Sequence, residues 1–174
     1  MNIGLQDKKS ATKPQRIPYS GARHVLLRVR SENGETIAAH RRVIAAKGSV
    51  LFGKAGKPIG PNFRETINQQ IEKGLNTFLF LTTREGWNGP YVTYRCFLRG
   101  VTSTVGAGKG KLIPDYYAFE ADNIGTWFEI TSIERLTREE MDRIFVLASG
   151  RSIMSSIKSS AAVFAVGISA RRVM

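Results

Sequence analysis

Glycine and lysine residues within the segment 48–60 approach the spacing of a phosphate-binding loop. Such a loop has a glycine, four further residues, then glycine and lysine, followed by a serine or threonine whose hydroxyl reaches the metal ion. Gly48, Gly53 and Lys54 stand at these positions, but Ala55 replaces the hydroxyl residue. A helical pattern precedes the segment where the loop needs a strand, so we do not expect nucleotide hydrolysis. The apolar run inside the segment instead predicts a short buried strand with lysines beyond it.

Side chains suited to catalysis are few in this sequence. The two histidines, His24 and His40, have no partners at metal-ligand spacing, and His40 shares a helical stripe with isoleucines that predicts a place in the core. Cys96 alternates with apolar residues and is interpreted as a small buried hydrophobe. A single cysteine also allows no intramolecular disulfide, which favours an intracellular setting. The sequence therefore predicts no catalytic residue, no metal and no cofactor.

A metal-dependent nuclease is the least favoured of the alternatives that the residues leave open. The common core of such enzymes needs an aspartate and then an acidic residue two positions before a lysine, so that carboxylates hold the metal and the lysine orients water. Asp115 and Glu129 supply the carboxylates, but Thr131 stands where the lysine belongs. The acidic pair in residues 120–122 fails in the same way.

Positive charge is concentrated in the first part of the chain. The protein has 174 residues and a net charge of +12. Residues 1–100 contain 17 lysines and arginines against 6 acidic residues, whereas residues 101–174 contain 9 against 8. Concentrated positive charge attracts phosphates without sequence preference, because binding releases counterions. Nucleic acid is the expected partner, and the alternative is an interaction or inhibitor protein that binds an acidic protein surface.

Length and composition predict one domain preceded by a polar arm. Residues 1–22 are basic, contain two prolines and lack apolar periodicity, so we expect a disordered basic arm. Residues 23–170 are expected to form a single domain with its own core. No apolar run approaches the roughly 20 residues needed to cross a bilayer. The expectation is a cytoplasmic protein with no membrane partner.

Apolar periodicity and turn signals divide the domain into short elements. Asn88-Gly89 between two apolar runs predicts an antiparallel hairpin, and Thr137 with Glu140 predicts a capping box at the start of a helix. Strands are expected over residues 24–30, 50–52, 75–82, 91–98, 116–119, 126–133 and 161–166. Helices are expected from residue 36 to a stop at 48, from 62 to a stop at 74, from 137 to about 148, and over 151–158. This pattern predicts an α+β fold, a small, mostly antiparallel β-barrel or strongly bent sheet with three or four peripheral helices.

The sequence contains more candidate binding residues than candidate catalytic residues. Trp87 at the hairpin tip, with Tyr91 just beyond it, would stack on unpaired bases if exposed, and the alternative is that Trp87 folds back as a lid on the sheet. Trp127 is a second candidate for stacking, with a core role as its alternative. Strand alternation directs several arginines outward without balancing acids, which favours an anionic partner. The full set expected to bind nucleic acid is Arg28, Arg30, Phe52, Lys54, Lys57, Trp87, Tyr91, Arg95, Arg99, Lys109, Lys111 and Trp127.

The order of elements resembles a known family. A strand over residues 24–30, a helix with Thr36-Ile37-Ala38-Ala39-His40-Arg41 and the segment Gly48-Ser49-Val50-Leu51-Phe52-Gly53-Lys54 are similar to the EVE branch of the PUA-like superfamily. A looser similarity follows at Gly125-Thr126-Trp127-Phe128. The resemblance implies a small β-barrel that binds DNA or RNA around a modified or flipped base. It implies that residues 50–54 border the pocket, with Phe52, Lys54 and a tryptophan near the base.

Overall fold

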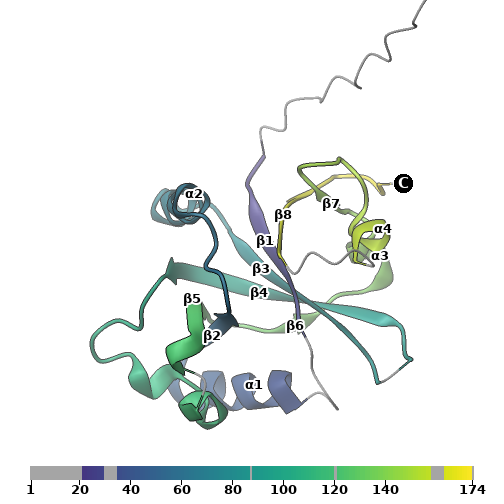
Figure 1. Ribbon diagram of the computed structural model, residues 1–174. Coiled ribbons are helices and arrows are strands. Elements are labelled where there is room, and N and C mark those ends of the chain that lie inside the picture. The colour runs from purple at the N-terminus through teal and green to yellow at the C-terminus, as the bar shows by residue number, and fades with distance from the viewer. Residues whose placement is uncertain (1–20, 30–34, 87, 120, 158–162, 174) are drawn as a thin grey trace, which may run out of the picture.

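The computed structural model describes residues 21–29, 35–86, 88–119, 121–157 and 163–173. Of the arm expected over residues 1–22, residues 1–20 lie outside these ranges. Figure 1 shows the arrangement of the chain. Its strands are β1 (His24–Arg28), β2 (Val50–Ala55), β3 (Phe78–Arg84), β4 (Tyr91–Thr102), β5 (Ile124–Ile130), β6 (Glu134–Arg135), β7 (Ile144–Val146) and β8 (Val163–Ile168). Its helices are α1 (Glu35–Lys47), α2 (Pro61–Glu72), α3 (Arg138–Met141) and α4 (Ile153–Ser156), with short 3-10 turns η2 (Gly110–Leu112), η3 (Asp115–Phe119) and η4 (Ala121–Asn123).

The eight strands form one mixed sheet that stays open. Its order is β2-β5-β4-β3-β1-β8-β7, and β6 pairs with β4 beside β5. Only β1 and β3 run parallel among the described pairs, so the expectation of a mostly antiparallel sheet is confirmed. No pairing joins the edge strands β2 and β7 in the described residues, so the sheet is not closed into a barrel.

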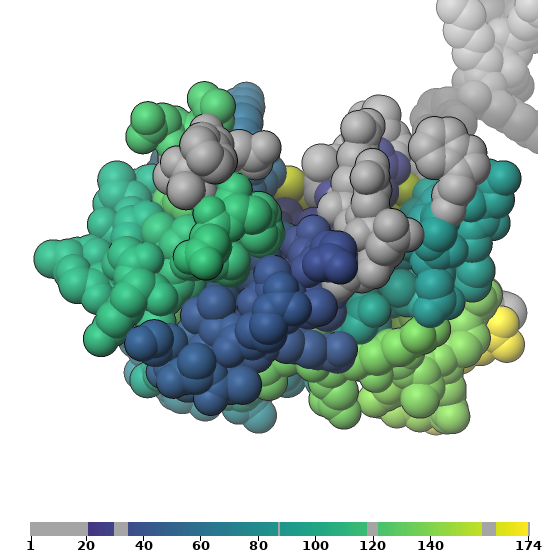
Figure 2. All heavy atoms as spheres, turned by 90° about the horizontal axis from the view of Figure 1, so that it is seen from below, coloured from purple at the N-terminus to yellow at the C-terminus, as the bar shows by residue number. Residues whose placement is uncertain are grey.

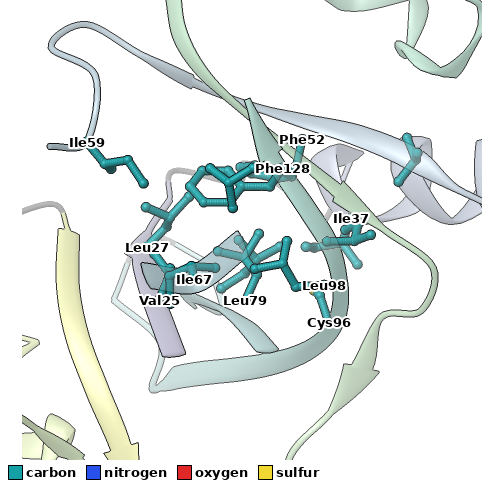
Figure 3. Packing of buried hydrophobic residues seen from close by; sticks show 14 residues of the cluster. Val25, Leu27, Ile37, Phe52, Ile59, Ile67, Leu79, Cys96, Leu98 and Phe128 are labelled. Atoms are coloured by element: carbon teal, nitrogen blue, oxygen red, sulfur yellow. The ribbon is translucent and has the colours of Figure 1, made fainter. Parts of the chain in front are cut away.

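The sheet bends along β4, which belongs to both of its halves. Residues at the start of β4 pair with β3 and β6, and residues at its end pair with β5. A shift of register between Leu98 and Gly100 makes Arg99 the extra residue of a β-bulge. Side chains from both halves, such as Leu79 and Phe128, therefore meet in one core cluster that α1 and α2 cover. Figure 3 shows that the side chains of this cluster come from several strands and helices and gather in one interior space.

The first strand is buried on both faces, which corrects the expectation of a half-buried strand with a basic outer face. Val25 and Leu27 enter the main core, whereas Leu26 enters a second cluster beneath α3, β7 and α4. Strand β1 lies between β3 and β8, and strands in the middle of a covered sheet have no solvent side. Arg28 at its end is half-buried. A short apolar run has the same pattern in both situations, which is why alternation misled here.

The expected elements around α1 and β2 are confirmed. Helix α1 ends before Gly48, whose φ of 85° lies in the left-handed region that favours glycine. Strand β2 follows at once and is buried at its first three residues. Helix α2 starts earlier than expected, because Gly60 is its N-cap and Pro61 its first residue. Proline at the first position of a helix loses no hydrogen bond, so the helix can begin one residue before the expected residue 62.

Two expected elements have a different structure. Residues 116–119 were expected as a strand, but they belong to the 3-10 turn η3. The helix expected over residues 137–148 ends at Met141, and Ile144–Val146 form strand β7 against β8. The capping box of Thr137 and Glu140 is present as expected. Residues 144–146 pair with β8, which follows later in the chain. This pairing outweighs the local helical periodicity.

The hairpin of β3 and β4 is confirmed, with Leu79 opposite Cys96 and Arg84 opposite Tyr91. Strand β3 begins at Phe78, later than the expected residue 75, and β4 continues to Thr102, beyond the expected residue 98. Leu75 is half exposed in the turn that leads to β3. Among the described residues, no helix combines the length and apolar character that crossing a membrane would require.

Candidate functional site

A large hollow lies between α1 and the 3-10 turns that follow β4. Its volume is about 920 Å³. Figure 2 shows the face of the molecule on which α1 and the segment after β4 lie next to each other. Helix α1 supplies one wall and residues 111–116 supply the other. We call this space, lined among others by Arg42, Lys47, Lys111, Asp115 and Tyr116, the first hollow.

An exposed tyrosine stands in the wall of the first hollow. The side chain of Tyr116 is 41% exposed, and Phe97 is the other aromatic residue classed as exposed in the described part of the chain. Tyr116 stacks on Tyr117 with ring centroids 4.3 Å apart and an interplanar angle of 30°. One aromatic face is thus supported from behind while part of the ring stays open to solvent. An open, supported ring is a surface on which a flat ligand can stack.

Buried rings form a foundation beneath Tyr116. His40 from α1 lies 4.6 Å from Phe52 and 5.7 Å from Tyr117, measured between ring centroids. Tyr117 in turn contacts Trp127 edge to face at 5.4 Å. His40, Phe52, Tyr117 and Trp127 are each at most 4% exposed. The foundation joins α1, β2, η3 and β5, so it fixes Tyr116 relative to α1.

Hydrogen bonds set the protonation state of His40. Its Nδ1 lies 2.7 Å from the carbonyl oxygen of Thr36, which can only accept, so Nδ1 carries the proton. Nε2 then accepts from the Tyr117 hydroxyl at 3.4 Å. Burial lowers the pKa of His40 to about 4, against the partial opposition of the Thr36 hydrogen bond. The ring is therefore a neutral, hydrogen-bonded member of the foundation, in agreement with the expectation of a core position.

Gly53 in β2 explains how Trp127 comes so close to the backbone of this strand. A Cβ atom at Gly53 would lie 2.9 Å from Cζ3 of Trp127 and 3.0 Å from Cγ2 of Ile124. Real side chains do not pack at such distances, so this position needs a glycine. The amide of Gly53 also donates to the Tyr117 hydroxyl at 3.1 Å. The glycine that resembled part of a nucleotide loop therefore makes room for Trp127 and Ile124.

Charged groups of both signs line the first hollow. Arg42, Lys47 and Lys111 are exposed, and none of them forms an ion pair with another described residue. Glu35 and Asp115 add two carboxylates to the lining. Cations of this kind contact phosphates, and carboxylates accept hydrogen bonds from the exocyclic amines of bases. Together with Tyr116, the hollow offers stacking, phosphate contacts and acceptors for a base edge.

The expected binding residues fall into separate groups in the structure. Lys111 lines the first hollow, and Phe52 lies in its foundation. Arg99 and Lys109 line a second, smaller hollow of about 300 Å³. Lys54 turns back on its own loop, where Nζ donates to the carbonyl oxygen of Lys57 at 2.6 Å. Lys57 itself is exposed. Arg30 and Trp87 lie outside the described residues.

Two expected outward-facing arginines have partners within the protein. The guanidinium of Arg28 donates to the carbonyl oxygen of Ile157 at 2.8 Å. Arg95 pairs with Glu134 at 2.7 Å and lies 4.0 Å from Glu140. The assumption that such arginines lack balancing acids is therefore wrong for Arg95. The acids come from β6 and α3, about forty residues further along the chain, where strand alternation gave no sign of them.

The aromatic candidates also differ from the expectation. Trp127 is 2% exposed and packs with Leu51, Tyr117 and Ile124, so its core alternative is confirmed and an exposed stacking role is wrong. Tyr91 is half-buried beneath the guanidinium of Arg84, which lies 4.9 Å from its ring centroid. Of the expected aromatic residues, none that the structure describes offers an open ring to the first hollow.

Catalytic groups do not converge in the described residues. Asp115 lines the first hollow and Glu129 the second, so the two carboxylates of the nuclease alternative lie in different places. The described residues include no group of three or more histidine, cysteine or acidic side chains placed to hold a metal ion. Cys96 is buried, and burial raises the pKa of its thiol. A buried thiol of this kind is a poor nucleophile.

Tyr116, which carries the site, is not among the binding residues expected from the sequence. Its segment was expected as a strand, and Arg42 and Lys47 lie in an expected helix without a binding role. The signal that was available is Pro114-Asp115, a pair typical of a turn, directly before two tyrosines. Tyrosines placed just after such a turn sit on an irregular segment, where exposed binding residues are common.

Comparison with known proteins gives one match. Residues 25–160 match the Pua-like family, which covers most of the chain. The match includes α1, β2 and the turns that build the first hollow. No curated protein and no solved structure matches the chain.

Proposed function

The chain belongs to the Pua-like family, and on that premise we propose that it is a non-catalytic nucleic-acid-binding module whose first hollow takes an unpaired or flipped base. Domains of this family commonly bind RNA or DNA and are generally non-catalytic. The observation that carries the proposal is the exposed ring of Tyr116, supported by Tyr117 and flanked by cations that have no ion pair in the described structure.

The roles of the residues follow from their chemistry. The base stacks on Tyr116, and its amino group donates to Asp115 or Glu35 at the rim. Arg42, Lys47 and Lys111 contact the phosphates on either side. Taking a base out of a duplex costs a few kcal/mol, least where pairing is weak or absent, so unpaired strands are preferred over duplexes. A volume of about 920 Å³ leaves room for a modified base.

Within the family, we propose membership of the EVE-like branch. The support is the order β1, α1, β2, with Gly48 and Gly53 flanking the buried start of β2 and His40 on the preceding helix. The strand also contributes Phe52 to the foundation of the first hollow, where its ring contacts His40. The tryptophan expected near the base is replaced in this assignment by Tyr116.

Fluorescence anisotropy with labelled oligonucleotides tests the proposed function. Single-stranded and duplex RNA and DNA of one sequence are titrated at 50 to 300 mM salt, and we expect tighter binding of the single strands with affinity that falls as salt rises. Tyr116→Ala is expected to weaken binding by about tenfold or more, since stacking on one aromatic ring contributes about 1 to 3 kcal/mol. Tyr116→Phe keeps the ring and is expected to retain binding.

Phe97→Ala is the matched control, because Phe97 is similarly exposed, at 39%, but lies outside the first hollow. Equal losses for Phe97→Ala and Tyr116→Ala would contradict the proposed site. Absence of binding at 50 mM salt, together with capture of a protein partner that survives nuclease treatment, would favour an acidic protein surface as the partner. Oligonucleotides that differ only in one base modification then show whether the module reads a modified base.

A further inference from the structure

A second hollow lies beside β4 and β5, and Asn68 of α2 also lines it. It has a volume of about 300 Å³, and its walls include Arg99, Gly100, Lys109 and Glu129. In the register of the sheet, Gly100 pairs with Glu129, which pairs on its other side with Leu51. These three positions therefore share the sheet face opposite the core residues Phe128 and Ile130. We call this space the second hollow.

The floor of the second hollow is open because Gly100 has no side chain. A Cβ atom at Gly100 would meet no heavy atom within 4 Å. On the same sheet face, by contrast, a Cβ atom at Gly53 would collide with Trp127. The glycine at 100 is thus not needed to make room for the protein's own side chains. It leaves space that a ligand can fill.

The β-bulge in β4 supplies the cation of this space. Arg99 is the extra residue at the shift of register between Leu98 and Gly100, and bulges of this kind redirect a side chain next to binding sites. Arg99 is exposed and forms no ion pair with another described residue. A guanidinium with this freedom can bind a phosphate through two parallel hydrogen bonds.

The opposite wall is held in place by an ion pair. The Lys109 ammonium lies 2.5 Å from Oε2 of Glu129, and the Ser49 hydroxyl donates to Oε1 of the same carboxylate at 3.4 Å. Glu129 is thereby satisfied within the protein, and the pair fastens the loop that carries Lys109 to β5. Arg99, by contrast, lines the second hollow without an ion pair to any described acidic residue.

One short loop contributes a lysine to each hollow. Lys109 lines the second hollow and Lys111 the first, and they are two residues apart in the chain. Two residues span at most about 7 Å, so the Cα atoms of the two lysines lie within that distance of each other. Neighbouring phosphates of one strand could therefore contact residues on both sides of this loop.

We propose that the second hollow holds the sugar-phosphate of the nucleotide next to the one in the first hollow, with Arg99 binding its phosphate. The inference rests on the proposed function and deepens it, because it makes the partner a single strand that runs over residues 109–111. A charged groove that follows one backbone beside an aromatic stacking surface is typical of single-strand binding. A duplex keeps neighbouring nucleotides stacked and cannot enter both concave sites.

The test compares a labelled mononucleotide, which can occupy the first hollow alone, with an eight-nucleotide single strand, in the unchanged protein and its variants. Arg99→Ala is expected to weaken binding of the longer strand about fivefold to tenfold. It also lowers the slope of log affinity against log salt by about 0.7, the loss of one phosphate contact. Gly100→Val is expected to weaken the longer strand by a similar factor, because its methyl groups fill the floor. Both variants are expected to bind the mononucleotide within about twofold of the unchanged protein.

Arg151→Ala is the matched control, since Arg151 is an exposed arginine beside β7 and lines neither hollow. Unchanged affinity of the longer strand in both Arg99→Ala and Gly100→Val would overturn the second site alone. An equal loss of affinity in Arg99→Ala for an eight-residue poly-aspartate peptide would overturn the assignment to a nucleotide. Failure of the unchanged protein to bind the eight-nucleotide strand at 50 mM salt would refute the proposed function itself, whatever the variants do.

Discussion

Replacing Gly53 by alanine adds a single methyl group at the most crowded point of the site. The new Cβ atom would lie 2.9 Å from Cζ3 of Trp127 and 3.2 Å from Cδ1 of Ile124. Trp127 is 2% exposed and Ile124 is 8% exposed, so neither ring nor methyl can move into solvent. Overpacking of this kind costs about 1 to 3 kcal/mol of unfolding free energy. In a protein of this size the loss corresponds to a melting temperature lower by roughly 2 to 12 °C.

The effect is expected to reach the binding site. The Gly53 amide donates to the Tyr117 hydroxyl, so a shift of β2 also displaces the ring on which Tyr116 stacks. Urea unfolding followed by tryptophan fluorescence gives the free energy, and oligonucleotide titration gives the functional cost. We expect both stability and affinity to fall in Gly53→Ala.

Two comparisons separate crowding from a general cost of alanine. Gly100→Ala places the same methyl group where no atom lies within 4 Å, and it is expected to be neutral or to stabilise by about 0.4 to 1 kcal/mol. In a Trp127→Phe background, the clashing part of the indole is gone, so Gly53→Ala is expected to cost at least about 0.5 kcal/mol less. Equal stability of Gly53→Ala and Gly100→Ala would refute the reasoning. So would a double-mutant cycle in which Gly53→Ala lowers the unfolding free energy equally in the Trp127→Phe background and in the unchanged protein.

Three further predictions follow from groups outside this contact. Burial lowers the pKa of His24 and of His40 from 6.5 to about 4, so the unfolded chain takes up protons first as the pH falls. Stability is then constant above about pH 6.5 and declines towards pH 4, by up to about 1.4 kcal/mol per pH unit for each histidine; equal urea midpoints at pH 7.5 and 5 would contradict this. Arg95→Ala is expected to cost at most about 1 kcal/mol, because its pair with Glu134 is largely exposed, and to leave oligonucleotide affinity within about twofold; a large loss of binding would return Arg95 to the site. The Cys96 thiol, buried and with a raised pKa, is expected to react with a thiol reagent only after unfolding, and rapid labelling of the folded protein would show that the core opens at β4.

Elements fixed by nearby residues could be predicted from the sequence. The turn around Asn88-Gly89 joined β3 and β4 in the expected antiparallel pair, because both strands lie within a few residues of their turn. Gly48 marked the end of α1, and Thr137 with Glu140 marked the start of α3. In each case the hydrogen bonds that decide the structure join residues close in the chain.

Features that depend on distant partners could not be predicted in this way. Arg95 looked unbalanced because its acid, Glu134, arrives on β6 as a cross-strand neighbour. Leu26 looked like part of an outer face because the cluster that buries it comes from residues 136–166. Tyr116 was placed in a strand, since a short run of aromatic and apolar residues fits a strand or an irregular turn equally well. The candidate site depends on all such distant contacts, so composition indicated its charge but not its position.

The place of β1 in the sheet also governs when the protein can fold. His24 pairs with Val166, so one edge of β1 stays uncovered until β8 is present. During synthesis β1 can join β3 once the middle of the chain has emerged, but the edge that β8 will occupy stays open until residues 163–168 have also emerged. Closing such a long loop is slow, and an open strand edge attracts other chains in the meantime. The strand order thus makes the growing chain prone to aggregation in the interval between the emergence of β3 and that of β8.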